Sequence, residues 1–307
     1  MSTEFVLIIA FITFLILLPL IVMILVRILI KDDPEEEEEE VEAGPDGPDL
    51  SNLSDFWRSM VPHLIELRDR LVKSLVAVGI GTSIGFYLVN TPSIIGQPLP
   101  DFMVEQLAPT IRLQAIGVGE VFVSYFRIAL VVGVAFAMPV IIYQIIAFFS
   151  PGLLPHEKRI VFMALPFVTE LFLAGLAFGW FFTAPAALEF LLGYGQTDLI
   201  STVPTLDSFM GTVAMLLLWN GIIFQLPAVI FLLARVGIVT AAQLARTRRY
   251  AIVIITIIAA LITPTGDPYN LLLLAIPMYL LYELGILLAR LVPKRRETSE
   301  TEAASAT

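Results

Sequence analysis

Residues 121–149, VFVSYFRIALVVGVAFAMPVIIYQIIAFF, decide the class of fold. Arg127 is the single charged residue in this long apolar stretch. A helix that crosses a bilayer needs about 20 predominantly apolar residues. The stretch is therefore long enough to form one membrane-spanning helix.

Similar apolar stretches lie on both sides of this one. They cover residues 5–30, 71–89, 160–183, 209–234, 250–263 and 269–289. The chain as a whole is 58% apolar, with a mean hydropathy of +0.88. These values exceed what the core of a soluble domain of 307 residues requires. We therefore expect an all-α, polytopic membrane protein.

Basic residues cluster at every second end of the apolar stretches. The clusters are Arg27/Lys31, Arg68/Arg70/Lys73, Lys158/Arg159, Arg246/Arg248/Arg249 and Lys294/Arg295/Arg296. Loops rich in Lys and Arg stay on the cytoplasmic side of a membrane, so these ends are predicted to face the cytoplasm. Arg112 is the only basic residue predicted in an outward loop. The N-terminus then lies outside and the C-terminus in the cytoplasm.

Four segments follow from this layout. Residues 1–31 lack a basic leading region and a cleavage pattern, so we predict an uncleaved membrane anchor. Residues 32–55 combine an acidic run with Gly and Pro, which is typical of a flexible cytoplasmic linker. A docking or regulatory role for the acidic run is the alternative. Residues 56–293 form the predicted core, and residues 294–307 a cytoplasmic tail.

The charge and the absence of cysteine narrow the function classes. Nine acidic residues between Asp32 and Glu42 account for most of the formal net charge of -10. The remaining chain is nearly neutral, so nothing indicates a nucleic-acid partner. The absence of Cys excludes disulfides and thiolate metal sites, and we expect neither a metal nor a cofactor.

The stretch 250–263 is shorter than the others. About 14 helical residues extend roughly 21 Å, whereas the hydrocarbon core is about 30 Å thick. Either the bilayer thins around this helix, or the predicted boundary is wrong by a few residues. In contrast, the outward connections 90–120 and 184–207 are long, and we expect them to form a structured cap.

A first cytoplasmic motif precedes the stretch 71–89. Residues 62–71, PHLIELRDRL, have helical periodicity, with leucines on one face and His63, Glu66 and Arg70 on the other. Glu66 and Arg70 are four residues apart. Their simplest interpretation is a surface pair that contributes about 0.3–0.5 kcal/mol.

A second cytoplasmic motif joins two later stretches. In residues 147–159, AFFSPGLLPHEKR, Pro151 ends one helix and Pro155 suits the first turn of the next. Glu157 then lies near a helix N-terminus, where the dipole favours a carboxylate. Taken alone, this motif is structural.

In this order and topology, the two motifs resemble the cytoplasmic signatures of the TatC family, a subunit of the twin-arginine translocase. Four further segments add to the resemblance, which covers about residues 56–290: VGEVF at 118–122, IFQLP at 223–227, LITP at 261–264 and LAIPMY at 274–279. The resemblance implies a concave six-helix bundle, here with one extra N-terminal transmembrane helix. It also implies short fifth and sixth helices.

The resemblance also implies a function and a site. TatC proteins recognise paired arginines in the signal peptides of folded cargo proteins, and Glu66 and Glu157 occupy the matching positions. Guanidinium groups prefer carboxylates that accept two hydrogen bonds, so two arginines need two such acceptors. Two further pairs of residues have supporting roles: Phe148 and Pro151 would shape the surface, and Arg68 and His63 would orient the first motif.

Further residues concern the assembly. Pro98 and Leu99 match a position of the outer loop that affects its shape. Gln225 matches a polar contact for single-span partner subunits of the TatA/TatB type. Gln can hydrogen-bond across helices but carries no charge. The resemblance implies self-association in a larger complex and export driven by the proton motive force in a prokaryotic inner membrane.

Three ionisable residues within the apolar stretches suggest a different class of protein. Arg127, Glu170 and Glu283 could form a polar relay in a secondary transporter or channel for a small solute. The simpler interpretation is structural pairing, with Arg127 as the candidate partner of Glu170. The cytoplasmic position of both motifs favours the translocase.

An enzyme is the other alternative. Residues 81–85, GTSIG, match the G-x-S-x-G nucleophile pattern, which requires a turn from strand to helix. Here the pattern lies inside an apolar helix, where small residues promote helix packing. We therefore expect a protein that is not an enzyme.

Overall fold

A computed structural model describes residues 53–92, 96–109, 111–152, 158, 161–196 and 203–292, with side chains from residue 61 onward. The predicted anchor, nearly all of the linker, the tail and Glu157 lie outside the described residues. The chain divides into two compact units, one up to Gly221 and the other from Ile222.

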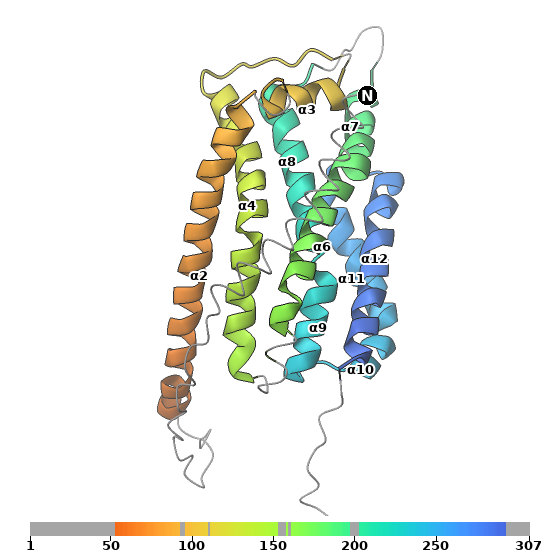
Figure 1. The fold of residues 1–307 in the computed structure, drawn as a ribbon. Coiled ribbons are helices and arrows are strands. Elements are labelled where there is room, and N and C mark those ends of the chain that lie inside the picture. The colour runs from red at the N-terminus through yellow and green to blue at the C-terminus, as the bar shows by residue number, and fades with distance from the viewer. Residues whose placement is uncertain are drawn as a thin grey trace, which may run out of the picture. The chain divides into compact units, whose positions relative to one another are not determined.

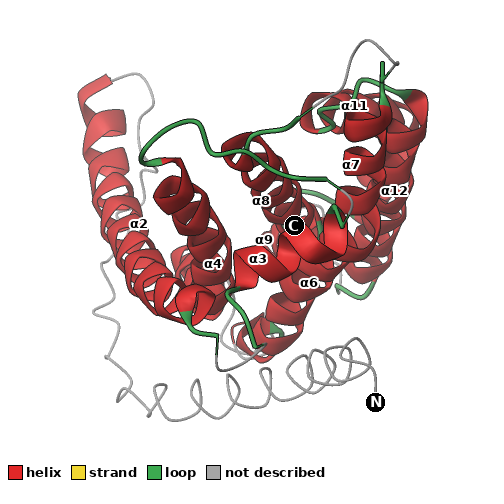
Figure 2. Cartoon of the chain, turned by 90° about the horizontal axis from the view of Figure 1, so that it is seen from above, coloured by secondary structure: helices red, strands yellow, loops and turns green. Residues whose placement is uncertain are grey.

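The described residues are helical and contain no β-strand, which confirms the all-α prediction (Figure 2). Five helical segments are long and apolar enough to cross a membrane. They are Val61–Asn90, Glu120–Phe149, Val161–Gly193, Leu206–Val236 and Pro268–Arg290. The predicted count of six spans in the core is therefore not reproduced in the described part of the chain.

Two long helices, α2 (Leu53–Asn90) and α4 (Glu120–Phe149), lie side by side in the first unit (Figure 1). Glycines allow this close approach. A Cβ atom on Gly81 would lie 2.4 Å from the carbonyl oxygen of Gly133, and one on Gly85 would lie 2.6 Å from that of Ala129. The GTSIG motif is therefore a helix-packing surface, as predicted.

The same helix α2 joins two elements that the sequence treats separately. The first cytoplasmic motif and the apolar stretch 71–89 form one continuous helix, with Pro62 inside it. Glu66 is therefore held on a rigid element that continues into the membrane.

The next membrane segment is longer than predicted. It comprises α6 (Leu165–Phe178), a π-helical turn (Gly179–Thr183) and α7 (Ala184–Gly193). The loop predicted to begin at residue 184 was wrong, because Pro185 occupies the first turn of α7, where its missing N–H is tolerated.

The two long connections contact each other, as a structured cap requires. The first contains α3 (Leu99–Leu107), with Pro98 at its N-cap, and α3 lies across the helix ends (Figure 1). Gln114 forms an isolated bridge with Thr205 of the second connection. The backbone N–H of Leu206 donates to the Gln114 carbonyl at 2.9 Å.

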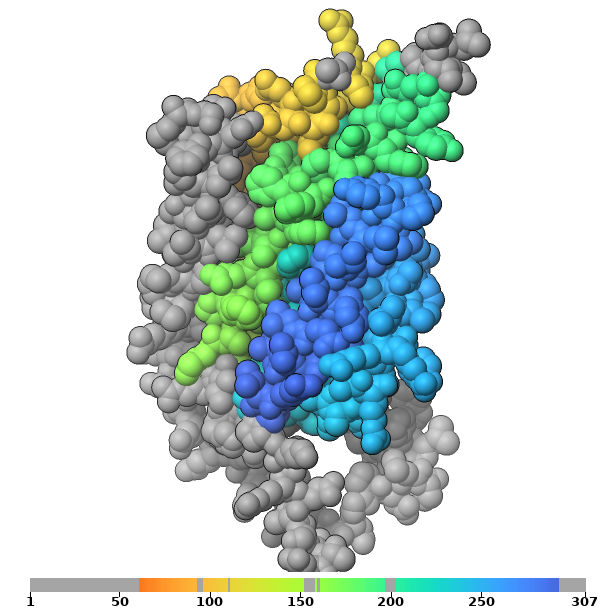
Figure 3. All heavy atoms as spheres, turned by 90° about the vertical axis from the view of Figure 1, so that its right-hand side faces the viewer, coloured from red at the N-terminus to blue at the C-terminus, as the bar shows by residue number. Residues whose placement is uncertain are grey.

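The second unit begins at the end of α8 (Leu206–Ile223), and its described residues form four further helices. They are α9 (Leu226–Val236), α10 (Ala241–Arg246), α11 (Arg248–Ile262) and α12 (Pro268–Arg290). Figure 3 shows α12 in dark blue against the paler α11. At 15 residues, α11 is too short to span a full bilayer, which confirms the predicted short helix.

Candidate functional site

Glu66 lies on α2 and is bound through one oxygen. The Nε and Nη2 atoms of Arg70 both donate to Glu66 Oε1, at 2.9 and 2.5 Å. The other oxygen, Oε2, accepts no hydrogen bond from any residue that the structure describes. The Glu66 side chain is 32% exposed, so this oxygen can accept a hydrogen bond from a ligand.

Arg68 does not contact Glu66. Its Nε and Nη2 atoms donate to Asp69 Oδ1 at 2.9 and 2.7 Å, and both side chains are exposed. His63 is also exposed. The sequence singled out Arg68 and His63 but missed Asp69. Its acidic charge between two arginines is the signal that could have identified it.

The second motif begins at the end of α4. Phe148 and Phe149 make an edge-to-face contact with ring centroids 5.3 Å apart. A short 3₁₀ turn, Ser150–Gly152, follows with Pro151 exposed. Pro151 therefore ends α4 as predicted.

The packing of α2 on α4 sets the two motifs at one level. The helices run antiparallel, with Gly81 opposite Gly133 and Gly85 opposite Ala129. The number of residues from Glu66 to Gly81 on α2 equals the number from Gly133 to Phe148 on α4. Because each helical residue adds the same rise, Glu66 and Phe148 lie at the same level of the unit.

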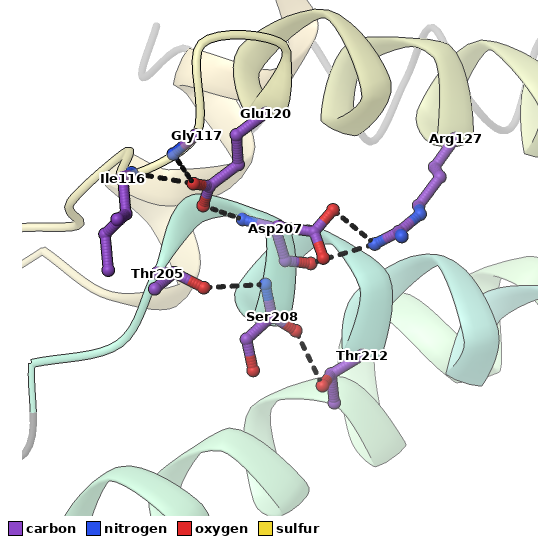
Figure 4. Close-up of polar contacts among 8 residues, drawn as sticks. All are labelled: Ile116, Gly117, Glu120, Arg127, Thr205, Asp207, Ser208 and Thr212. Atoms are coloured by element: carbon purple, nitrogen blue, oxygen red, sulfur yellow. Dashed lines mark hydrogen bonds and ion pairs between the residues drawn. The ribbon is translucent and has the colours of Figure 1, made fainter.

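At the other end of this helix pair lies a group that we call the loop clasp, formed by Glu120, Arg127 and Asp207 (Figure 4). The Oε2 atom of Glu120 accepts from the backbone N–H groups of Ile116 and Gly117, at 2.7 and 3.0 Å. Its Oε1 atom accepts from the backbone N–H of Asp207 at 2.9 Å. Glu120 therefore ties both long connections to the start of α4.

Arg127 completes the loop clasp. Its Nη1 atom lies 2.8 Å from Asp207 Oδ1 and donates to the Asp207 carbonyl at 3.1 Å. The candidate pairing of Arg127 with Glu170 was therefore wrong. Pairing across 80 residues leaves no local pattern, which explains why the sequence did not reveal Asp207.

Glu170 and Glu283 have different surroundings. Glu170 is half-buried on α6 and forms no ion pair with a residue that the structure describes. Glu283, on α12, accepts from Arg248 Nη2 at 2.8 Å and from the Tyr279 hydroxyl at 2.9 Å. Since Arg127 and Glu283 each have a partner within their own unit, these contacts do not support the predicted relay.

Gln225 lies where the helix is interrupted before α9. Its backbone N–H donates to the Ile222 carbonyl at 3.0 Å, and Pro227 follows in the first turn of α9. The Gln225 side chain is half-buried. Its role as a contact for a partner subunit stays a prediction.

These features define a polytopic helical membrane protein with a polar motif at one end of a long membrane helix. The family model described as "Sec-independent protein translocase protein (TatC)" matches residues 62–277. The chain belongs to the TatC family. It is therefore a multi-pass inner-membrane component of protein transport and not an enzyme.

Individual relatives agree with this assignment. The TatC protein of Desulforapulum autotrophicum is 37% identical over 243 residues, which cover 79% of this chain and 88% of the relative. That of Aquifex aeolicus is 37% identical over 244 residues, with 78% and 97% covered. A crystal structure of the twin-arginine translocase receptor TatC aligns with a TM-score of 0.61 at 37% identity. The alignment covers 75% of this chain and 98% of the chain in the crystal structure.

Proposed function

We propose that this chain is the core and receptor subunit of a twin-arginine protein translocase. It binds the paired arginines of a signal peptide at its cytoplasmic face, through Glu66 and Glu157. The observation that carries the proposal is the open Oε2 atom of Glu66, on a rigid helix and level with the end of α4.

The chemistry of the site suits arginine better than lysine. A guanidinium is planar and donates two parallel hydrogen bonds, whereas an ammonium is a compact point charge. Arg70 already occupies Oε1, and an incoming guanidinium can donate two N–H groups to Oε2, as Arg70 does to Oε1. Glu157 supplies the second acceptor in this proposal. Phe148 and Pro151 of the second motif shape the surface between Glu66 and Glu157.

The proposal includes the assembly and the energy source. TatA/TatB-type single-span subunits contact the chain near Gln225, and copies of the chain associate in a larger complex. The proton motive force drives export of folded proteins. A membrane potential supplies about 2.3 kcal/mol per elementary charge per 100 mV. Residues 1–31 anchor the chain with its N-terminus outside, and the C-terminus is cytoplasmic.

A binding measurement tests the receptor role. The purified full chain is titrated with a labelled twin-arginine signal peptide and with the same peptide carrying Lys-Lys. We expect tight binding of the first peptide alone, and loss of that binding in Glu66→Gln and in Glu157→Gln.

Glu105→Gln is the matched control, because Glu105 is an exposed carboxylate on α3, beyond the far end of α2. The proposed site would be contradicted if the native chain and the three variants all bound both peptides equally.

A further inference from the structure

An apolar groove of about 600 Å³ runs between α2 and α4. Its α2 side contains the small residues Gly79 and Ser83, both exposed. Phe86 of α2 and Phe126 of α4 form its walls. Small residues spaced four apart let a second transmembrane helix approach closely. The α2 side of the groove therefore allows a second helix to approach closely.

The groove contains one exposed hydroxyl group, that of Ser83, within the apolar part of α2. The Ser83 hydroxyl donates to the Gly79 carbonyl at 2.9 Å, which leaves its oxygen able to accept. Thr82 does not offer its hydroxyl to the groove, because its Oγ1 atom is buried and would lie 2.6 Å from a Cβ atom on Gly133 of α4. Acyl chains cannot satisfy polar groups, so an occupant with a polar atom at this depth is favoured over lipid.

The chain itself carries a segment that can reach this groove. Residues 5–30 form an apolar stretch of transmembrane length, and residues 31–52 connect it to the first residue of α2. This linker spans roughly 70 Å when extended and about 26 Å on average as a flexible chain. Such a tether gives the segment an effective concentration of about 1 mM beside α2.

The residue pattern of the segment matches the depth of the groove. Thr13 is the only hydroxyl-bearing residue in 5–30. The number of residues from Thr13 to Arg27 equals the number from Asp69 to Ser83. In an antiparallel helix pair, Thr13 opposite Ser83 therefore brings the positive charge of Arg27 level with the negative charge of Asp69. The register that pairs the hydroxyl groups also brings Arg27 level with the Asp69 carboxylate, which Arg68 binds through Oδ1 alone.

From these observations we propose that residues 5–30 dock in the groove between α2 and α4 of the same chain. The segment runs antiparallel to α2, with Thr13 opposite Ser83. Its large aliphatic side chains cover Gly79 and Ser83, and the Thr13 hydroxyl donates to the Ser83 oxygen. The inference is independent of signal-peptide binding.

Disulfide cross-linking tests the proposal, because the chain has no native cysteine. Thr13→Cys is combined with Ser83→Cys in the full chain and oxidised in native membranes. The matched control combines Thr13→Cys with Ile84→Cys, since Ile84 is adjacent in sequence but exposed outside the groove. A protease site inserted in the linker distinguishes a disulfide within one chain from one between two chains.

We expect the Ser83 pair to form a disulfide within one chain about tenfold more than the Ile84 pair. Equal yields would overturn the proposal, as would disulfides between two chains only. The proposal would also be overturned if none of Ala10→Cys, Thr13→Cys and Leu17→Cys formed a cross-link with Ser83→Cys.

A second variant blocks the groove without disturbing the helix pair. A Cβ atom on Gly79 meets no atom within 4 Å, so Gly79→Phe fills the groove while the contacts of Gly81 and Gly133 stay intact. We expect Gly79→Phe to abolish the Ser83 cross-link with an unchanged thermal midpoint. An unchanged cross-link in this variant would place the segment elsewhere and overturn the proposal.

Discussion

Glu66 and Glu120 lie toward opposite ends of the same helix pair and use their oxygens differently. Both oxygens of Glu120 accept backbone N–H groups from the two long connections. In Glu66, one oxygen is bound by Arg70 of the same helix, and the other has no described partner. Both oxygens of the Glu120 carboxylate are therefore used in hydrogen bonds within the fold, whereas the Glu66 carboxylate can still accept a hydrogen bond from a ligand.

The comparison shows why a conspicuous acidic residue is not by itself a binding site. Hydrogen bonds to a charged group are worth more than neutral ones, so a carboxylate that accepts three of them stabilises the structure around it. The Glu66–Arg70 pair, four residues apart and only partly buried, contributes little to stability. Replacement of each carboxylate should therefore affect different properties.

The largest expected effect is the loss of peptide affinity that Glu66→Gln causes. Loss of a charge-assisted contact of about 1.5–3 kcal/mol lowers affinity for a twin-arginine peptide by roughly 10- to 150-fold. Loss of the Arg70 pair changes the free energy of unfolding by only about 0.5 kcal/mol. Peptide titration and thermal unfolding measure the two effects. A large loss of stability with unchanged affinity would reverse the assignment of this residue.

The next effect concerns Glu120→Gln and is on stability. The amide keeps one acceptor oxygen, but its NH₂ group faces N–H donors, so the two long connections separate more often. We expect cleavage of residues 90–120 by added protease to become about tenfold faster, because cleavage follows the population of the open form. Peptide affinity should not change. Glu105→Gln serves as the control, and equal cleavage in both variants would argue against the loop clasp.

A smaller effect is expected for Asp207→Asn. The change weakens the ion pair with Arg127, whose partners are each 40% exposed, by about 0.2–1 kcal/mol. The backbone N–H of Asp207 still donates to Glu120, so the connections remain tied. A double-mutant cycle with Arg127→Gln isolates the pair. Destabilisation as large as that of Glu120→Gln would show that the Arg127 pair, and not the Glu120 contacts, holds the loop clasp.

The smallest effect depends on pH and concerns Asp267 at the start of α12. Burial raises the pKa of this carboxyl, but hydrogen bonds, including those from the backbone and side chain of Asn270, outweigh burial and lower the pKa to about 2 from 3.8. The folded state therefore gains stability above pH 3.8, which is lost as the pH falls toward 2.

Asp267→Asn isolates this charge, since Asn is also a good N-cap. The difference in thermal midpoint between the native chain and this variant should be constant near neutral pH and shrink below about pH 4. A difference that stays constant down to pH 2 would contradict the lowered pKa.

Much of the architecture could be predicted because it depends on local sequence. Long apolar runs specify membrane helices, since the backbone must satisfy its own hydrogen bonds in lipid. The short α11 follows from the distance between Arg249 and Pro264. The packing role of Gly81 and Gly85 follows from their spacing within an apolar run.

The sequence by itself therefore determined the class of fold and the helix-packing glycines. Only the tertiary structure decided which carboxylates are occupied by long-range hydrogen bonds and ion pairs. Asp207 meets Arg127 across 80 residues, and Glu120 reaches Asp207 across 87. Local periodicity carries no record of such contacts, because they form only when separate helices and loops have packed together.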